Sequence, residues 1–519
     1  MRLYTLLILI VVLPAFAAAQ AGITCPHPPS GHSFLPVQEF LSSDWMEGRE
    51  TGTRGGAMAA GYVASMMEFT GLKPFGNDHS WFQRFQVVRY SIGSASLTLV
   101  RENQDGTDWL RGVDFTVDTL PFAGEAEAGV VFAGYGIECK DNGYNDYRDM
   151  DVRKCIVVIF EGYPGHPDTT TAPGKIFMEE YGDRSDAMEK KIALARSKGA
   201  LAVIVAAPVE TVGIAVERKD TTGQAEPVYT DDGYYLPGGT SALSIPCLRL
   251  GRDASRMLLG SLPVSPAVFQ EKAARELTSS AGALPGTRIR FSVALKKEHL
   301  PVSNVLGLLP GRDTSRFVLI GAHYDHLGMR NNLTYNGADD NASGVSGMMA
   351  LAQAWAACPE RPSCNLIFAA WTAEEKGVLG SEYFALNSTL MQGKLSLVVN
   401  LDMISRSAPE DSSRRVVSIG TLPADSNLRD MAGRSNARLA KPFTLDLWDV
   451  TGHCGSDYCH FASRGIPVIT FFSGFHDDYH SPRDIFPGTD PEKMEGILTI
   501  VNDCLREGTR ISLRKPGQH

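Results

Sequence analysis

Acidic and histidine side chains follow several short apolar runs in the C-terminal part of this 519-residue chain. The runs are typical of buried strands, and the side chains that follow them are His323, Asp325, Asp340, Glu374, Glu375, Asp402 and His480. Carboxylates are seldom buried unless they are paired or bind a metal. Because several carboxylates together repel one another unless cations lie between them, this pattern predicts a metal site.

The types of these side chains indicate which metal binds. Two histidines with three carboxylates form a set of nitrogen and oxygen donors that suits zinc better than calcium, which prefers oxygen alone. One carboxylate has two oxygens and can bridge two ions ~3.5–4 Å apart, the spacing of two-metal hydrolases. The expected metal is therefore zinc, with room for two ions.

Alternation along a strand assigns different directions to neighbouring side chains. At the end of the run "LIFAAWTAEEKG", one of the adjacent glutamates Glu374 and Glu375 can bind a metal while the other faces the reacting water. In "GAHYDHLG", His323 and Asp325 share a face and His326 points the other way. Asp325 is then expected to accept a hydrogen bond from the free N–H of His323.

The elements that would position these side chains alternate between strands and helices from Arg316 onward. We expect strands at "RFVLIGAH", "NLIFAAW", "LSLVVNLD" and "PVITFFS", and helices over about 342–357, from near 378, and over 491–506. This order indicates an α/β fold with a mixed, largely parallel central sheet and helices on both faces. In such open sheets, ligands bind beyond the carboxyl ends of the strands.

A second, smaller α/β module is expected before this part of the chain. Residues 36–72 suggest two helices, whereas short alternating runs from about residue 94 suggest strands. Within the module, an amphipathic helix between "CIVVIF" and "LAVIVAAP" completes a βαβ unit. The predicted organisation is a signal peptide at 1–19, an N-terminal segment of the main domain at 20–93, an inserted domain at 94–290 and the main catalytic domain at 291–519.

The N-terminal segment "MRLYTLLILIVVLPAFAAAQ" is typical of a secretory signal cut after Ala19, because its apolar run is shorter than the ~20 residues that span a bilayer. Later apolar runs are also too short, so the mature protein is expected to be soluble, with no membrane association, and secreted or periplasmic. A net charge of −10 without a long basic run argues against nucleic acid or an anionic membrane surface as a partner.

Nine cysteines fit an oxidising compartment and leave an odd one. Cys358 with Cys364, and Cys454 with Cys459, could each close a small loop, but the spacing does not decide the pairing. Cys454 and Cys459 could also be read as metal ligands; this interpretation is weak because no second cysteine cluster accompanies them.

The ordered motifs "GAHYDHLG", "NGADDNASGVSGMM", "TAEEKGVLGSEYF", "NLDM", "GSDYCHFASRGIPVI" and "YHSPRD" resemble the dizinc peptidases of the aminopeptidase type, metallopeptidase family 28. The resemblance runs from about residue 302 to the C-terminus, and "SDWMEGRETGTRGG" is similar to the family's N-terminal segment. It implies an exopeptidase that acts on peptides with two zinc ions per chain. The insert resembles a protease-associated domain, which could be a lid over the substrate or a stabilising insert.

The resemblance also implies a role for each site residue. His323 and Asp402 would hold one zinc, Glu375 and His480 the other, and Asp340 would bridge them, because it aligns with the bridging position of the "DNASG" motif. Asp339 is the less favoured bridge. The general base would be Glu374, and Tyr479 would either stabilise the oxyanion or pack. The peptide bond between Asp340 and Asn341 is expected to be cis, and Lys376 is expected to be a solvated neighbour.

Several other functions remain open or are disfavoured by the same motifs. A carboxypeptidase or dipeptidase would use the same metal core, and glutaminyl cyclases resemble this fold but use one zinc. Non-enzymatic receptors of this architecture lack the ligands that are present here. A serine hydrolase would need a Gly-x-Ser-x-Gly elbow, which "GVSGM" does not supply.

Overall fold

The computed structural model describes residues 26–117, 122–140, 142–165, 172–181, 184–207, 232–238, 245–260, 262, 264–279 and 281–511. The chain divides into two compact units: unit 1 contains residues 1–84 and 303–519, and unit 2 contains residues 85–302. The expected signal peptide lies outside the described residues. Within them, no helix is long and apolar enough to cross a membrane.

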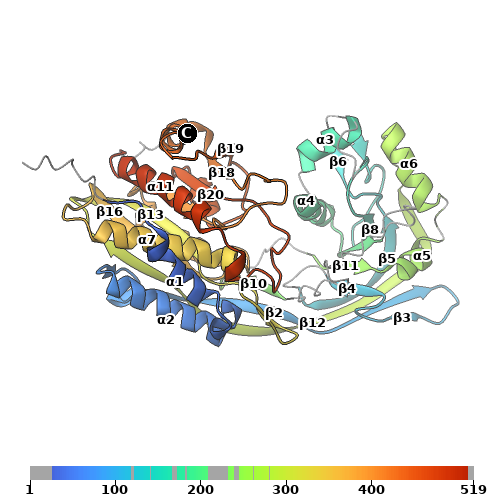
Figure 1. Ribbon diagram of the computed structural model, residues 1–519. Coiled ribbons are helices and arrows are strands. Elements are labelled where there is room, and N and C mark those ends of the chain that lie inside the picture. Colours follow the sequence, from blue (N-terminus) through green and yellow to red (C-terminus); the bar gives the residue numbers. More distant parts are fainter. Residues whose placement is uncertain are drawn as a thin grey trace, which may run out of the picture. The chain divides into compact units, whose positions relative to one another are not determined.

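Unit 1 is built on a mixed sheet in which the central strands are parallel (Figure 1). The order across the sheet is β19-β18-β20-β17-β13-β16-β12, where the pairs of β13 with β16 and β17, β17 with β20, and β18 with β19 are parallel. The strands are β13 (Asp313–His323), β16 (Cys364–Trp371), β17 (Leu395–Leu401), β18 (Val416–Thr421), β19 (Thr444–Asp449), β20 (Val468–Phe472), the end of β12 (Gly282–Leu309), and the short β1 (Lys73–Pro74), β14 (Gly328–Arg330) and β15 (Leu333–Tyr335).

Helices cover both faces of this sheet because side chains along each buried strand alternate between two apolar clusters. In β16, for example, Phe368 joins the cluster with α1, α2, α7, α9 and α11, whereas Ile367 joins the cluster with α8 and α10. The helices are α1 (Gly31–Leu41), α2 (Arg54–Phe69), α7 (Gly344–Ala356), α8 (Leu379–Asn387), α9 (Ser426–Asn436), α10 (Cys459–Ala462) and α11 (Pro491–Gly508). The predicted fold class is confirmed.

Unit 2 has its own apolar clusters, which pack around a further set of strands. Its strands β5, β8, β9 and β11 are parallel neighbours, and α4 connects β8 with β9 as the sequence predicted. The elements are β2 (Phe82–Arg101), β3 (Thr107–Trp109), β4 (Phe115–Val117), β5 (Gly124–Phe132), β6 (Glu138–Cys139), β7 (Tyr144–Asn145), β8 (Ile156–Phe160), α3 (Ala172–Tyr181), α4 (Arg184–Ser197), β9 (Ala202–Ala206), β10 (Gly233–Tyr235), β11 (Cys247–Leu250), α5 (Arg252–Leu259), α6 (Pro266–Glu276) and most of β12.

Candidate metal centre

The predicted site residues all lie in unit 1, at or after the carboxyl ends of its strands. His323 is the last residue of β13, and Asp402 directly follows β17. Glu374 and Glu375 follow β16, and His480 lies in the loop after β20. Since these strands are parallel neighbours, their carboxyl ends meet at one edge of the sheet, which brings the side chains together.

Two groups of donor atoms meet at the two oxygens of Asp340. In the first, which we call the His323 half-site, His323 Nε2 lies 3.4 Å from Asp340 Oδ1 and 3.3 Å from Asp402 Oδ1. In the second, the His480 half-site, His480 Nε2 lies 3.1 Å from Asp340 Oδ2 and 3.2 Å from Glu375 Oε2. Asp340 therefore presents one oxygen to each group.

These separations fit metal coordination. Two atoms that bind the same zinc at about 2.0–2.2 Å lie about 3.0–3.5 Å from each other, which is the range found in both half-sites. His480 Nε2 is buried and makes no hydrogen bond, although two carboxylate oxygens lie near it. A cation between this nitrogen and the two carboxylates would satisfy all three groups.

The His323 ring is held by the backbone of its own loop. His323 Nδ1 donates a hydrogen bond to the carbonyl oxygen of Asp325 at 3.1 Å, so in the neutral ring Nε2 is the nitrogen that can bind a metal. The sequence assigned this role to the Asp325 carboxylate, but its Oδ1 is 4.0 Å from His323 Nδ1. The carboxylate instead accepts hydrogen bonds from Thr51 Oγ1 at 2.8 Å and from the Glu374 N–H at 3.1 Å, because the chain turns after β13 ends.

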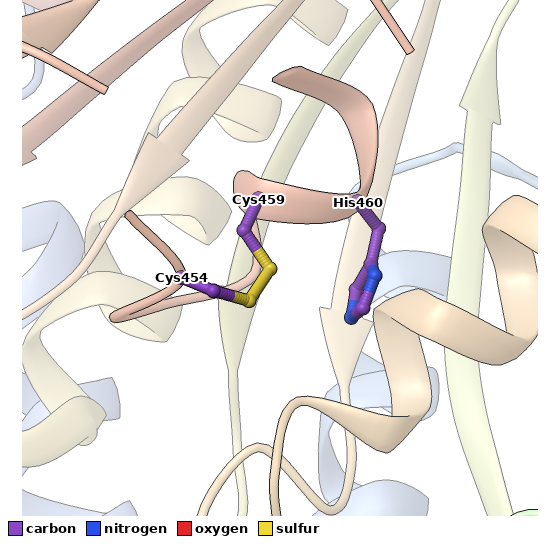
Figure 2. A group of neighbouring side chains, drawn as sticks. All are labelled: Cys454, Cys459 and His460. Carbon is purple, nitrogen blue, oxygen red and sulfur yellow. A yellow bond between two sulfur atoms is a disulfide. The ribbon is translucent and has the colours of Figure 1, made fainter. Parts of the chain in front are cut away.

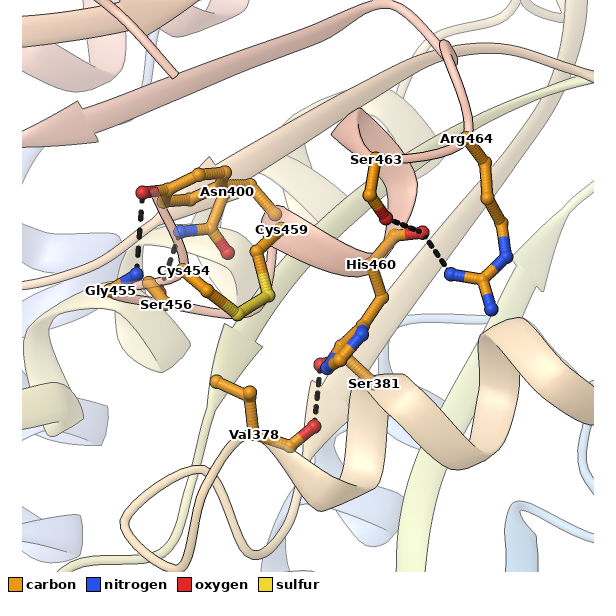
Figure 3. Close-up of a disulfide and its surroundings, with 11 residues drawn as sticks. Val378, Ser381, Asn400, Cys454, Gly455, Ser456, Cys459, His460, Ser463 and Arg464 are labelled. Carbon is orange, nitrogen blue, oxygen red and sulfur yellow. Dashed lines mark hydrogen bonds between the residues drawn. A yellow bond between two sulfur atoms is a disulfide. The ribbon is translucent and has the colours of Figure 1, made fainter. Parts of the chain in front are cut away.

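Asp402 is held by a loop that a disulfide closes. Ser456 Oγ donates to Asp402 Oδ2 at 2.6 Å, and Asn400 Nδ2 donates to Ser456 Oγ at 2.9 Å. Ser456 lies between Cys454 and Cys459, which form a disulfide (Figure 2; Figure 3 shows the hydrogen bond to Asn400). The remaining oxygen of Asp402 faces His323.

The same disulfide removes the alternative reading of these cysteines as metal ligands. Cys454, Cys459 and His460 lie close together, as Figure 2 shows, but sulfurs bonded to each other are not thiolate ligands. The other suggested pair, Cys358 with Cys364, is wrong because Cys364 is a free thiol buried in β16.

The two adjacent aspartates have separate environments. Asp339 Oδ1 accepts hydrogen bonds from the N–H and the hydroxyl of Ser405 at 2.7 and 2.9 Å, so this carboxylate faces away from the half-sites. Asp340 is the one that lies between His323 and His480. The peptide bond between Asp340 and Asn341 is cis, which confirms that prediction.

The adjacent glutamates Glu374 and Glu375 have opposite electrostatic environments. Burial raises the pKa of Glu374 well above its usual value, and the nearby Asp402 adds to the effect. Burial alone would also raise the pKa of Glu375, but His326 and His480 outweigh it and hold the pKa well below its usual value. Glu374 Oε2 lies 3.8 Å from His323 Nε2, beside the His323 half-site without forming a hydrogen bond to it.

Two residues near the site lie elsewhere than predicted. His326 points into the site, and its Nδ1 is 2.6 Å from Glu375 Oε1. The expected alternation fails because β13 ends at His323, so the residues after it no longer follow the pleat. Lys376 is not a solvated neighbour: its side chain is 7% exposed, and its Nζ lies 2.9 Å from Glu50 Oε1.

Tyr479 packs flat against a site histidine. Its ring is stacked on that of His480, with centroids 3.8 Å apart and an angle of 21° between the planes. Burial raises the pKa of Tyr479 above its usual value, and the nearby carboxylate of Asp340 adds to the effect. The phenol therefore remains a hydrogen-bond donor at neutral pH.

Residues 304–504 match the model of peptidase family M28. The match includes all five donor residues of the two half-sites. The segment that carries the site is thus similar to peptidase family M28.

Curated relatives resemble the chain over part of their length. A probable zinc metalloprotease of Pyrenophora teres f. teres is 31% identical over 27% of this chain and 30% of that protein. Aminopeptidase YwaD of Bacillus subtilis is 26% identical over 40% of this chain and 45% of that protein. The chain thus matches less than half of the length of these relatives.

Solved structures share the fold of the M28 segment and of the chain around it. An aminopeptidase from Aneurinibacillus sp. strain AM-1 matches 93% of this chain and 95% of its own, with a TM-score of 0.59 and 18% sequence identity. At this identity the likeness shows a common fold.

Proposed function

We propose that this protein is an exported zinc exopeptidase, most simply an aminopeptidase, that removes N-terminal residues from peptides with two zinc ions. The observation that carries the proposal is the pair of donor groups that meet at Asp340, with donor separations of 3.1–3.4 Å. One bridging carboxylate between two such groups is the pattern of a two-metal hydrolase. The names of the relatives, a zinc metalloprotease and an aminopeptidase, agree with it.

In this proposal His323 and Asp402 would hold one zinc, Glu375 and His480 would hold the other, and Asp340 would contribute one oxygen to each. When bound, the zinc ions supply Lewis acidity, which polarises the scissile carbonyl and makes the attacking water more acidic. The His323 half-site keeps its donors oriented through Ser456 on Asp402 and the Asp325 carbonyl on His323.

Glu374 is the proposed general base. Its carboxylate takes a proton from the attacking water and later gives that proton to the nitrogen of the leaving amine. Asp325 positions it, because the Asp325 carboxylate accepts a hydrogen bond from the Glu374 N–H. For Tyr479 we propose that the phenol O–H donates to the oxygen that becomes negative in the transition state.

Export and the identity of unit 2 belong to the same proposal. The Cys454–Cys459 disulfide is typical of proteins in oxidising compartments, which agrees with the signal-like N-terminal sequence. The parallel βαβ arrangement of β8, α4 and β9 supports a protease-associated domain in unit 2.

A peptide panel tests the activity. The purified protein, stripped with a chelator and then reloaded with zinc, would be given peptides with free or acetylated N-termini and with free or amidated C-termini. An aminopeptidase cleaves only peptides with a free N-terminus and ignores the state of the C-terminus. A requirement for a free C-terminus would favour the carboxypeptidase, and cyclisation of N-terminal glutamine with one zinc per chain would favour the cyclase.

A further inference from the structure

His326 is a third imidazole in the metal centre, and its ring lies with Asp340 and Glu375 in a group whose possible ligand atoms are all within 4.8 Å of one another. It is fully buried, and its Nδ1 lies 2.6 Å from Glu375 Oε1. It is farther from the bridging residue, with 3.7 Å between Nδ1 and Asp340 Oδ2. Its other nitrogen, Nε2, has no hydrogen-bond partner among the described residues. The side-chain hydrogen bond of this ring is therefore the one to Glu375.

The short distance distinguishes a hydrogen bond from shared coordination. Two atoms on one zinc lie about 3.0–3.5 Å apart, whereas a hydrogen bond between a nitrogen and a carboxylate is shorter, at about 2.7–2.9 Å. The 2.6 Å between His326 Nδ1 and Glu375 Oε1 is too short for a common ion. Since a carboxylate oxygen can only accept, Nδ1 carries the proton and donates it to Oε1.

The hydrogen bond leaves the second oxygen of Glu375 for the half-site. Glu375 Oε2 lies 3.2 Å from His480 Nε2, the separation expected for two ligand atoms of one ion, while Oε1 accepts the hydrogen bond from His326. The carboxylate is thereby fixed in one orientation, with one oxygen for each neighbour.

The backbone around His326 fixes the ring in turn. The His326 N–H donates to the Arg49 carbonyl at 3.3 Å, and the buried Arg49 guanidinium donates to the carbonyls of Tyr324 and Gly337 at 2.8 and 2.9 Å. Gly337 has a φ of +55°, and a Cβ built on it would lie 2.5 Å from the Cδ2 atom of the His326 ring. The ring therefore fills the space that a side chain at position 337 would need.

We propose that His326 is a positioning residue for Glu375: its Nδ1–H holds one carboxylate oxygen so that the other binds the ion of the His480 half-site. This inference rests on the proposed two-zinc function. It assigns His326 to one half-site only, so losing its hydrogen bond should weaken one ion and leave the other unchanged.

Calorimetric titration of the metal-free full-length protein with zinc tests this. We compare the wild type with His326→Ala, His326→Asn and a control, His32→Ala, which changes an exposed histidine of α1. We expect two binding events in the wild type and the control. In His326→Ala one event should weaken by about 10–100-fold, the usual cost of losing a residue that orients a metal ligand. The Asn variant should recover part of the loss, because its amide N–H can replace Nδ1–H.

The outcomes separate this inference from the function on which it rests. If the wild type binds two ions and both affinities are unchanged in His326→Ala and His326→Asn, the positioning role is wrong. It is also wrong if cobalt-substituted His326→Ala retains both ions but its visible spectrum shows the loss of a nitrogen ligand, since His326 would then bind metal directly. Fewer than two ions in the wild type would contradict the proposed two-zinc function itself.

Discussion

The His323 and His480 half-sites use the same kinds of donor but are supported in different ways. The His323 half-site is held by a backbone carbonyl and by a hydroxyl from a disulfide-closed loop. The His480 half-site is held by a second imidazole, that of His326, and by a stacked tyrosine. Its histidine side chain is also more open, 22% exposed against 2% for His323.

If two ions bind as we propose, this difference would allow the affinity of each half-site to be tuned separately. A carboxylate ligand that accepts one hydrogen bond from the protein keeps a single oxygen for the metal. Ser456 donates this bond to Asp402, and His326 donates it to Glu375. Changes to Asp340 should therefore affect both half-sites, and changes to the supporting residues should affect one.

The largest effect is expected for Asp340→Ala. Removing the common carboxylate deprives both half-sites of a ligand, so both ions should be lost at once. Since bound metal contributes several kcal/mol to catalysis, activity should fall by about 10³-fold or more. Elemental analysis and peptide hydrolysis measure this, with Asp430→Ala, a change to an exposed carboxylate of α9, as the control. Retention of one tightly bound ion would show that Asp340 is not a bridge.

The two adjacent glutamates should respond differently to the same change. Glu374→Gln should keep both ions while the rate falls by roughly 10²–10⁴, the usual contribution of a general base. Glu375→Gln should first lose the ion of the His480 half-site, because an amide is a poorer ligand than a carboxylate. Metal content and rate measured on both variants check this. The roles are reversed if Glu374→Gln loses an ion and Glu375→Gln keeps both.

Ser456→Ala is the counterpart of the His326 variants. Without the Ser456 hydroxyl, Asp402 loses the hydrogen bond to Oδ2, and the affinity of the His323 half-site should fall by about 10–100-fold. The His480 half-site should be unaffected. Zinc titration of Ser456→Ala beside Ser463→Ala, an exposed serine nearby, measures the difference. Equal weakening of both ions would mean that the half-sites are not tuned separately.

The smallest effect is expected for opening the disulfide. Cys454 and Cys459 are five residues apart, so the double change to serine should lower the free energy of unfolding by only about 2 kcal/mol, because a short loop gains little entropy when the bond is removed. Ser456 becomes less fixed, and the His323 half-site should weaken less than in Ser456→Ala. Denaturant unfolding and zinc titration provide the two measurements. A larger loss of zinc affinity than in Ser456→Ala would show that the loop does more than orient Ser456.

The sequence predicted the fold and the gathering of several site residues because both follow from strand ends. His323 ends β13, Asp402 follows β17 and Glu374 follows β16, each after an apolar run that is easily recognised as a buried strand. Parallel neighbours then bring these residues to one edge without further information. The ligand assignments themselves stay predictions.

Residues beyond the strand ends could not be predicted in the same way. His326 was placed on the wrong face because alternation was continued past the end of β13, where the chain turns. Lys376 is charged, which suggested solvent, but its partner Glu50 is 326 positions away in the sequence. Asp325 was identified as important, yet whether His323 donates to its carboxylate or to its carbonyl depends on the loop conformation.

The most direct test is anomalous diffraction at the zinc absorption edge, from crystals of the full-length protein loaded with zinc. The account predicts two peaks about 3.5–4 Å apart, one beside His323 and Asp402 and one beside His480 and Glu375, with Asp340 between them and with His326 hydrogen-bonded to Glu375 and bound to neither ion. A single peak, or two peaks that Asp340 does not bridge, would contradict it.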